Sequence, residues 1–220
     1  MKHAKRHPLI FGTLILTITG LITRIIGFFY RIYLSRLFGE EGMGIYQLLS
    51  PALSLSFSLT AAGYQTAISK YVAADSAKRP SGNLKPLLAG ISITLPLSLV
   101  TNAILFFSAD PIGIFLLKDH RTVPMLRILS FSVPFAALHA CINGYFYGKK
   151  KASVPALTQL LEQLARVSCV FLVTGADLAE GRTPSINAAV LGLTVGEIFS
   201  MLIALVCLYI HLYPDNRILS

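Results

Sequence analysis

The chain has 220 residues, of which 54% are hydrophobic and 13% charged, with a mean hydropathy of +0.67. No soluble globular domain of this length needs so apolar a composition, so the sequence predicts an integral membrane protein. Its three cysteines all lie in apolar runs without CxxC or Cys/His spacing, which indicates neither a disulfide framework nor a metal site.

The chain begins with MKHAKRHP, a basic stretch that is followed by a long apolar run, as in a secretory signal peptide. The run is too long for a signal-peptide core, however, and no small-x-small cleavage site closes it. We therefore interpret residues 1–8 as a basic cytoplasmic N-terminus and the run as a retained membrane span.

Six apolar stretches of 20 or more residues are each long enough for a hydrocarbon core of roughly 30 Å. Turn-forming segments separate them: GEEGMG, DSAKRPSGN, SADP, GKKK and GADLAEGRTP. The run PIGIFLL after Asp110 is too short to span, and we expect it to lie along the outer surface. The sequence thus predicts an all-α polytopic membrane protein with a cytoplasmic tail over 213–220. The expected spans are approximately Leu9–Leu34, Ile45–Ile68, Leu87–Phe107, Val123–Phe146, Val154–Val173 and Ile186–His211.

Two arginines, Arg24 and Arg31, lie inside the first span, where one arginine near the centre costs at least about 2.5–3.5 kcal/mol. They are seven residues apart, so a helix places them on one face. Each arginine could snorkel to the interface or pair with a structural acid. Two arginines on one stripe of small residues favour instead the lining of a cavity. The other members of the stripe are Thr13, Thr17, Gly20 and Gly27.

The fifth span carries a second polar stripe with the spacing i, i+3, i+4, i+7, formed by Gln159, Glu162, Gln163 and Arg166. Glu162 and Arg166 are placed to pair with each other. The stripe is either an internal ion pair with two amides that satisfy neighbouring backbone groups, or a polar wall of the cavity that Arg24 and Arg31 line.

Two further polar residues are candidates for ion or proton coupling. Glu197 lies in the sixth span beside Gly192-x-x-x-Gly196, a pattern that allows helices to approach closely. As a buried carboxylate it could titrate or pair with an arginine, or it could serve packing. His139 lies one turn before Asn143 in the fourth span, which favours an interhelical hydrogen bond over a proton relay.

The basic residues indicate the orientation of the chain. Eleven lie in one set of connecting segments and five in the alternate set. The positive-inside rule then places both termini in the cytoplasm. The net charge of +9 is mostly this topological signal and not a nucleic-acid-binding surface. The larger set is Lys2, Lys5, Arg6, Lys70, Lys78, Arg79, Lys85, Lys149, Lys150, Lys151 and Arg217.

Within the spans, three bases (Arg24, Arg31 and Arg166) stand against two acids (Glu162 and Glu197). A cavity with net positive charge attracts anions, and the planar fork of arginine suits phosphate or pyrophosphate. The sequence contains no GxxxxGK[ST], HExxH or GxSxG motif, so it predicts neither an enzyme nor a protein with a cofactor. It favours a membrane protein that binds or moves an anionic, phosphorylated substrate.

Two segments resemble the stage V sporulation protein B family. They are GFFYRIYLSRLFGEEGMGIYQLLSPALSLSFSLTAAGYQTAISKYVA (27–73) and GYFYGKKKASVPALTQLLEQLARV (144–167). That family belongs to the polysaccharide-transporter branch of the multidrug/oligosaccharidyl-lipid/polysaccharide exporters, beside the lipid II flippases. The resemblance implies two six-helix lobes that form a V and alternate between inward-open and outward-open states. It also implies that first-span arginines hold the lipid pyrophosphate. Arg24 and Arg31 match those positions, although the spacing of the second arginine differs in the flippases.

The resemblance implies a flippase of a polyprenyl-linked oligosaccharide or of a peptidoglycan or spore-cortex precursor in the bacterial cytoplasmic membrane. The alternatives are a cation-coupled exporter of small drugs on the same fold and a non-transporting membrane scaffold of the cell-wall machinery. Because six spans make only the N-terminal lobe, we expect a truncated or split product that lacks its C-terminal lobe, or two copies that pair.

Overall fold

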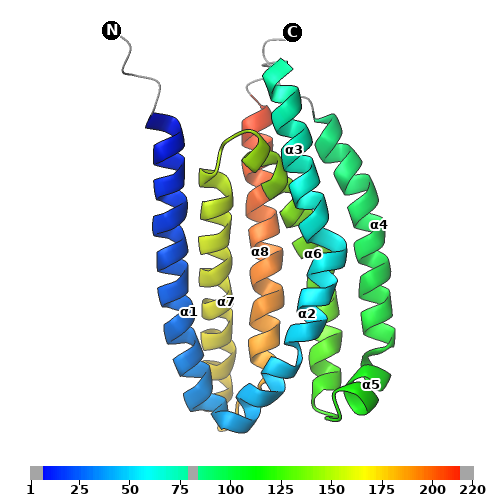
Figure 1. Cartoon of the computed structure of the whole chain (residues 1–220). Coiled ribbons are helices and arrows are strands. Elements are labelled where there is room, and N and C mark those ends of the chain that lie inside the picture. Colours follow the sequence, from blue (N-terminus) through cyan, green and yellow to red (C-terminus); the bar gives the residue numbers. More distant parts are fainter. Residues whose placement is uncertain (1–6, 79–83, 214–220) are drawn as a thin grey trace.

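The computed structural model describes residues 7–78 and 84–213, and in this part of the chain every regular element is a helix (Figure 1). Most of the basic N-terminus and of the C-terminal tail, both predicted to be cytoplasmic, lies outside the described residues. The helices are α1 (His7–Leu48), α2 (Ser50–Phe57), the π-helical turn η1 (Ser58–Ala62), α3 (Gly63–Lys78), α4 (Lys85–Phe107), α5 (Ala109–Pro111), the π-helical turn η2 (Ile112–Leu116), α6 (Thr122–Gly148), α7 (Ser153–Ala179) and α8 (Asn187–Leu212).

The first helix does not end near Leu34 as predicted but continues to Leu48, because the GEEGMG segment is helical apart from Gly39. Gly39 has φ 68° and ψ −175°, a backbone conformation that glycine adopts without steric cost, and α1 bends there. After Leu49 the chain enters α2, which has a proline in its first turn, and runs back through α3 antiparallel to α1 (Figure 1).

Five helical stretches of the described chain are long and apolar enough to cross a membrane. The all-α polytopic class is therefore confirmed, whereas the count of six spans is not. The reason is the bend: the first stretch, Gly12–Ser76, is 65 residues long and includes most of α1 and of its antiparallel return. The PIGIFLL run forms part of the short α5–η2 corner between α4 and α6 (Figure 1).

The centre of the bundle is α6, which packs against α3, α4 and α8. Its Tyr145 and Phe146 are almost fully buried, whereas large apolar side chains on the outer helices are exposed; Phe107, for example, is 79% exposed. In water such a surface would be strongly unfavourable, so these faces suit contact with lipid.

Glycines allow the closest helix contacts. A Cβ added at Gly144 of α6 would lie 2.6 Å from the carbonyl oxygen of Gln65 in α3, so the two backbones nearly touch. The close approach predicted for Gly192-x-x-x-Gly196 is confirmed: a Cβ at Gly196 would lie 3.0 Å from the Glu162 carbonyl oxygen. These glycines therefore position α8 directly against the polar stripe of α7.

The two ends of the bundle differ in charge. The start of α1, the end of α3, the start of α4, the α6–α7 turn and the end of α8 lie at one end, which is the end predicted to be rich in basic residues (Figure 1). At the other end Arg121 contacts both Glu41 (2.7 Å) and Asp119 (3.0 Å). Hydrogen bonds from Arg121 lower the pKa of the Asp119 carboxyl. Which end faces the cytoplasm stays a prediction.

Candidate functional site

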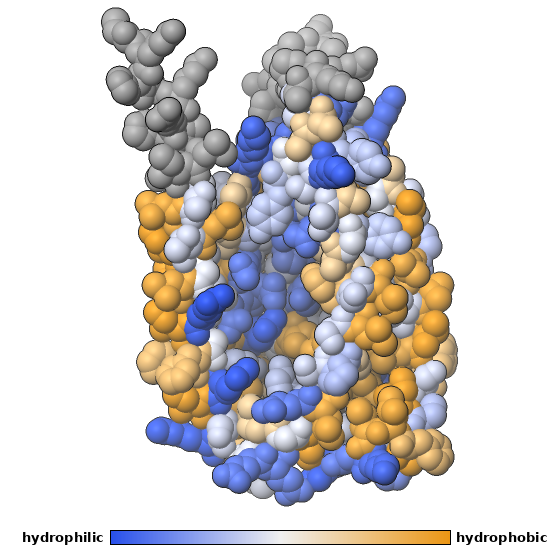
Figure 2. Space-filling view, in the orientation of Figure 1, coloured by the Kyte–Doolittle hydropathy of each residue, from blue (hydrophilic) through white to orange (hydrophobic). Residues whose placement is uncertain are grey.

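Hydrophilic side chains gather in a hollow between α1 and the α2–α3 arm, while the outer faces of the same helices are hydrophobic (Figure 2). Since α7 packs against α1 and α8 packs against α7, these two helices form the back of the hollow (Figure 1). On this face of the molecule the hydrophilic side chains thus gather in the hollow and not on the hydrophobic outer surface (Figure 2).

One cavity in this region has a volume of about 390 Å³, and we call it the arginine cavity. Arg24 and Arg31 of α1 and Gln163 and Arg166 of α7 line it, so four of the six predicted substrate-binding residues lie together. No carboxylate occurs among its lining residues in the described chain. The other lining residues are Gly27, Phe28, Tyr30, Leu34, Met43 and Tyr46.

Specific contacts between α1 and α7 hold the cavity in shape. The Tyr33 hydroxyl lies 2.7 Å from the Thr174 hydroxyl, and the Tyr33 ring stacks on Phe171 with centroids 4.1 Å apart. Gly27 lies opposite the Gln163 amide, since a Cβ at Gly27 would be 3.6 Å from Nε2. Gly20 has open space beside it. The small residues of the arginine stripe therefore leave room for a ligand.

The arginine cavity offers hydrogen-bond donors in excess. Arg24 and Arg31 are exposed to the hollow, and the Tyr30 hydroxyl and the Arg166 Nε are buried without a hydrogen-bond partner among the described groups. Arg166 also pairs with Glu162, with Nη2 2.5 Å from Oε1. A buried donor without a partner loses its hydration, so an anion that accepted these hydrogen bonds would be favoured.

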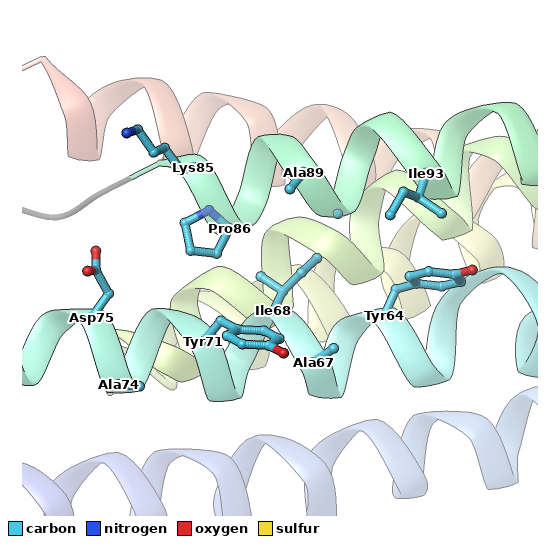
Figure 3. A pocket seen from close by; sticks show the side chains of 11 residues that line it. Tyr64, Ala67, Ile68, Tyr71, Ala74, Asp75, Lys85, Pro86, Ala89 and Ile93 are labelled. Atoms are coloured by element: carbon cyan, nitrogen blue, oxygen red, sulfur yellow. The ribbon is translucent and has the colours of Figure 1, made fainter.

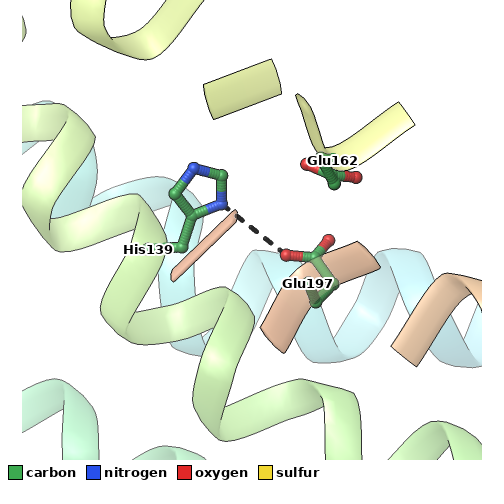
Figure 4. A group of neighbouring side chains, drawn as sticks. All are labelled: His139, Glu162 and Glu197. Carbon is green, nitrogen blue, oxygen red and sulfur yellow. Dashed lines mark ion pairs between the residues drawn. The ribbon is translucent and has the colours of Figure 1, made fainter. Parts of the chain in front are cut away.

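The remaining candidates lie on the other side of α7, in a cavity of about 190 Å³ that we call the carboxylate cavity. Gln159 and Glu162 of α7, Glu197 of α8 and His139 of α6 line it. The nitrogen and oxygen atoms of His139, Glu162 and Glu197 that could bind a cation lie within 4.8 Å of one another, with the three side chains pointing to a common space (Figure 4). The predicted single site is therefore two cavities, joined by the Glu162–Arg166 ion pair.

Sequence reasoning missed several lining residues. Tyr30 lies three residues after Gly27, a spacing that could have assigned it to the arginine stripe. Met43 and Tyr46 reach the cavity only because α1 bends at Gly39, and no periodicity of the sequence indicates that.

A larger cavity, of about 660 Å³, lies between α3 and α4 (Figure 3). Its walls are mostly apolar, with Tyr64, Tyr71 and Asp75 on α3 and Lys85 on α4. None of the predicted site residues lines it. Its size alone does not make it the functional site, because it lacks the concentrated charge that the spans bury elsewhere.

Comparison with known proteins gives consistent matches. The model of a family described as "Polysaccharide biosynthesis protein" matches residues 9–220. Stage V sporulation protein B of Bacillus subtilis is 36% identical over 197 residues, which cover 89% of this chain and 38% of that protein. The Lipid II flippase MurJ of Bacillus subtilis is 27% identical over 176 residues, which cover 76% of this chain and 32% of that protein.

A third relative, the uncharacterized membrane protein YabM of Bacillus subtilis, is 26% identical over 97% of this chain and 39% of its own length. The chain thus spans less than two fifths of the length of these relatives. No solved structure matches it.

Proposed function

Because the chain belongs to the polysaccharide biosynthesis protein family, we propose that it is part of a flippase that moves a polyprenyl-linked glycan precursor across the bacterial cytoplasmic membrane. The name of one relative, Lipid II flippase, supports this class of substrate. Both termini face the cytoplasm in this proposal, and the substrate crosses by alternating access without covalent chemistry on the protein.

The observation that carries the proposal is the arginine cavity. Arg24, Arg31 and Arg166 converge from two helices on a space that no carboxylate of the described residues lines, and the Tyr30 hydroxyl adds another donor. Guanidinium groups bind phosphate oxygens in pairs, and a pyrophosphate offers several oxygens at once. The open hollow leaves a path by which the attached lipid chain reaches the bilayer (Figure 2).

The carboxylate cavity gives some support to the alternative of a cation-coupled drug exporter. That function needs carboxylates as the dominant cavity groups, but Glu162 is already paired with Arg166. The arginine cavity is also about twice as large, at about 390 Å³ against about 190 Å³. These observations favour an anionic substrate over a cationic drug.

The hollow with Arg24 and Arg31 is open on one side, so a second lobe or a second copy of the chain would close it in this proposal. A non-transporting scaffold would not need such closure. Reconstitution with and without a separately supplied C-terminal lobe distinguishes the flippase from the scaffold. Transport that requires the second lobe supports the flippase. Normal cell-wall function without any transport supports the scaffold.

The first prediction tests the arginines directly. With the chain in lipid nanodiscs, Arg24→Lys and Arg31→Lys should each weaken binding of a polyprenyl pyrophosphate by about ten-fold or more. Lysine keeps the charge but loses the fork, and one charge-assisted hydrogen bond contributes about 1.5–3 kcal/mol. In the full-length protein, complementation or precursor translocation, normalised to protein in the membrane, should fall in parallel.

Arg36 provides the matched control, because it lies on the same helix and is exposed but does not line the arginine cavity. Arg36→Lys should leave binding and translocation near normal. Full activity of an Arg24→Ala, Arg31→Ala double variant would reduce both arginines to structural residues and would remove the argument for an anionic substrate.

A further inference from the structure

His139 lies at the meeting point of three membrane-spanning helices and is 7% exposed. Its Nδ1 is 3.1 Å from the Ser200 hydroxyl and 3.7 Å from a carboxylate oxygen of Glu197, both on α8. Its Nε2 is 2.8 Å from the Asn143 amide nitrogen on α6 and 3.2 Å from the Thr158 hydroxyl on α7. Each ring nitrogen thus has two polar neighbours.

These partners define the proton on the neutral ring. The Ser200 hydroxyl donates to the Glu197 carbonyl, so its oxygen accepts from an N–H at Nδ1. The Asn143 amide nitrogen donates to Nε2, which is then the unprotonated atom. In its neutral form His139 therefore directs its N–H toward Ser200 and the Glu197 carboxylate.

The same surroundings also satisfy the charged ring. The Thr158 hydroxyl donates to the Pro155 carbonyl, so its oxygen is free to accept from an N–H at Nε2. Half a turn of the Asn143 amide would present a second acceptor there. No backbone movement is needed to pass between the two forms, which is the geometry that a reversible proton site requires.

A count of charges around His139 gives the preferred occupant. From α7, Glu162 lines this cavity, and its charge is neutralised by Arg166 at 2.5 Å; from α8, Glu197 adds one negative charge. From α3 the lining residue is the uncharged Gln65, and Tyr147 of α6 is a neutral phenol. Arg24 and Arg31 of α1 lie in the neighbouring arginine cavity. One added positive charge balances the cluster, whereas a divalent metal ion would leave an excess beside three arginines.

We propose that His139 and Glu197 form a binding site for one proton, and that the Glu162–Arg166 pair links this site to the arginine cavity. The proton adds to Nε2 of His139, and the resulting imidazolium donates from Nδ1 toward Glu197. It also lies close to Glu162, so it competes with Arg166 for that carboxylate. Protonation therefore frees the Arg166 guanidinium for an anion, and by linkage an anion in the arginine cavity favours protonation.

The proton site is tested without any anion. The chain is labelled with ¹⁵N and ¹³C at histidine, placed in lipid nanodiscs, and followed by NMR between pH 8 and pH 5, with His139→Gln to assign the signal. We expect the His139 ring to change from the neutral Nδ1–H form to imidazolium across this range. In Glu197→Gln the ring should become charged only at a lower pH than in the wild type, because its nearest counter-ion is gone while Glu162 stays paired with Arg166. Glu180→Gln, which removes an exposed acid in the α7–α8 turn, is the control and should behave as wild type.

A His139 ring that stays neutral in the wild type, or that titrates equally in Glu197→Gln, overturns the proposal. Metal binding is the competing outcome. If Zn²⁺, Mn²⁺ or Na⁺ raises the midpoint of thermal unfolding of the wild type but not of His139→Gln, the cluster is a metal site and not a proton site.

The link to the arginine cavity rests on the proposed function and has its own test. Calorimetric titration with inorganic pyrophosphate, in buffers of different ionisation enthalpy, counts the protons taken up on binding. We expect uptake of up to half a proton per anion in the wild type at the midpoint of the His139 titration, where half of the rings are already charged, and loss of most of it in His139→Gln. Failure of pyrophosphate to bind would contradict the proposed function while the NMR result stood. Equal uptake in both proteins would contradict the link alone.

Discussion

Arg166 holds a position that no other residue of the described chain shares, since it lines the arginine cavity while its guanidinium pairs with Glu162 of the carboxylate cavity. The side chains of Arg166 and Glu162 are only 21% and 16% exposed. At this burial, the loss of one partner leaves the other as a poorly hydrated charge. Removing one partner is therefore expected to cost more folding free energy than the intact pair contributes.

At the residue scale, Arg166→Gln should destabilise the protein by about 3–5 kcal/mol, because Glu162 then lies unpaired near Glu197. The double variant Arg166→Gln, Glu162→Gln should be milder than the single variant, since it removes the unpaired charge as well. The measurement is the free energy of unfolding in detergent micelles. A double variant that is no more stable than Arg166→Gln would show that the two side chains are not coupled.

At the element scale, the contact between α6 and α3 depends on Gly144. A Cβ there would lie 2.6 Å from the Gln65 carbonyl oxygen, and a backbone atom cannot move aside as a flexible side chain could. Gly144→Ala should therefore lower stability by about 1–3 kcal/mol, the range typical of overpacked sites. The midpoint of thermal unfolding and the yield of monodisperse protein report the change.

Gly175 of α7 is the matched control, because a Cβ at this helical glycine would meet nothing within 4 Å. Gly175→Ala should be neutral or stabilising by up to about 1 kcal/mol, since alanine favours the helix more than glycine does. If both variants lost stability equally, the close contact between α6 and α3 would not be the cause.

At the scale of the whole molecule, the basic residues at one end of the bundle predict the orientation in the membrane. In a background without Cys169 and Cys207, a cysteine at Ala152 should be protected from an impermeant thiol reagent in intact cells, and one at Thr183 should react. Ala152 precedes α7 and Thr183 follows it, so the two sites lie at opposite ends of one helix. Reaction at Ala152 would reverse the predicted orientation. Two further sites extend the test: a cysteine at Glu41 is predicted to react, and one at Ser81, which lies outside the described residues, is predicted to be protected.

In the candidate site, the spacing of residues predicts the arginines of α1 but not the division of the polar stripe of α7 between two cavities. Arg24 and Arg31 can be identified from the sequence because their helical spacing and their position inside an apolar run are both visible there, and a charge in lipid is costly. The separation of Gln159 and Glu162 from Gln163 and Arg166 was not found. Helical spacing places all four on one broad face, but the packing of α1 on one flank of that face and of α6 and α8 on the other divides them.

The sequence by itself determined the membrane class, the helical fold, the family and the polar stripes, because hydropathy, periodicity and local motifs are carried by neighbouring residues. Only the tertiary structure decided that α1 continues through GEEGMG and bends at Gly39, since a glycine at a positive φ is compatible with a turn as well as with a bent helix. It alone brought together His139, Glu162 and Glu197, which come from three helices. Such contacts depend on how helices pack. The close packing at Gly144 and Gly196 needs two helices to meet, so the residues of one helix alone do not reveal which helices meet.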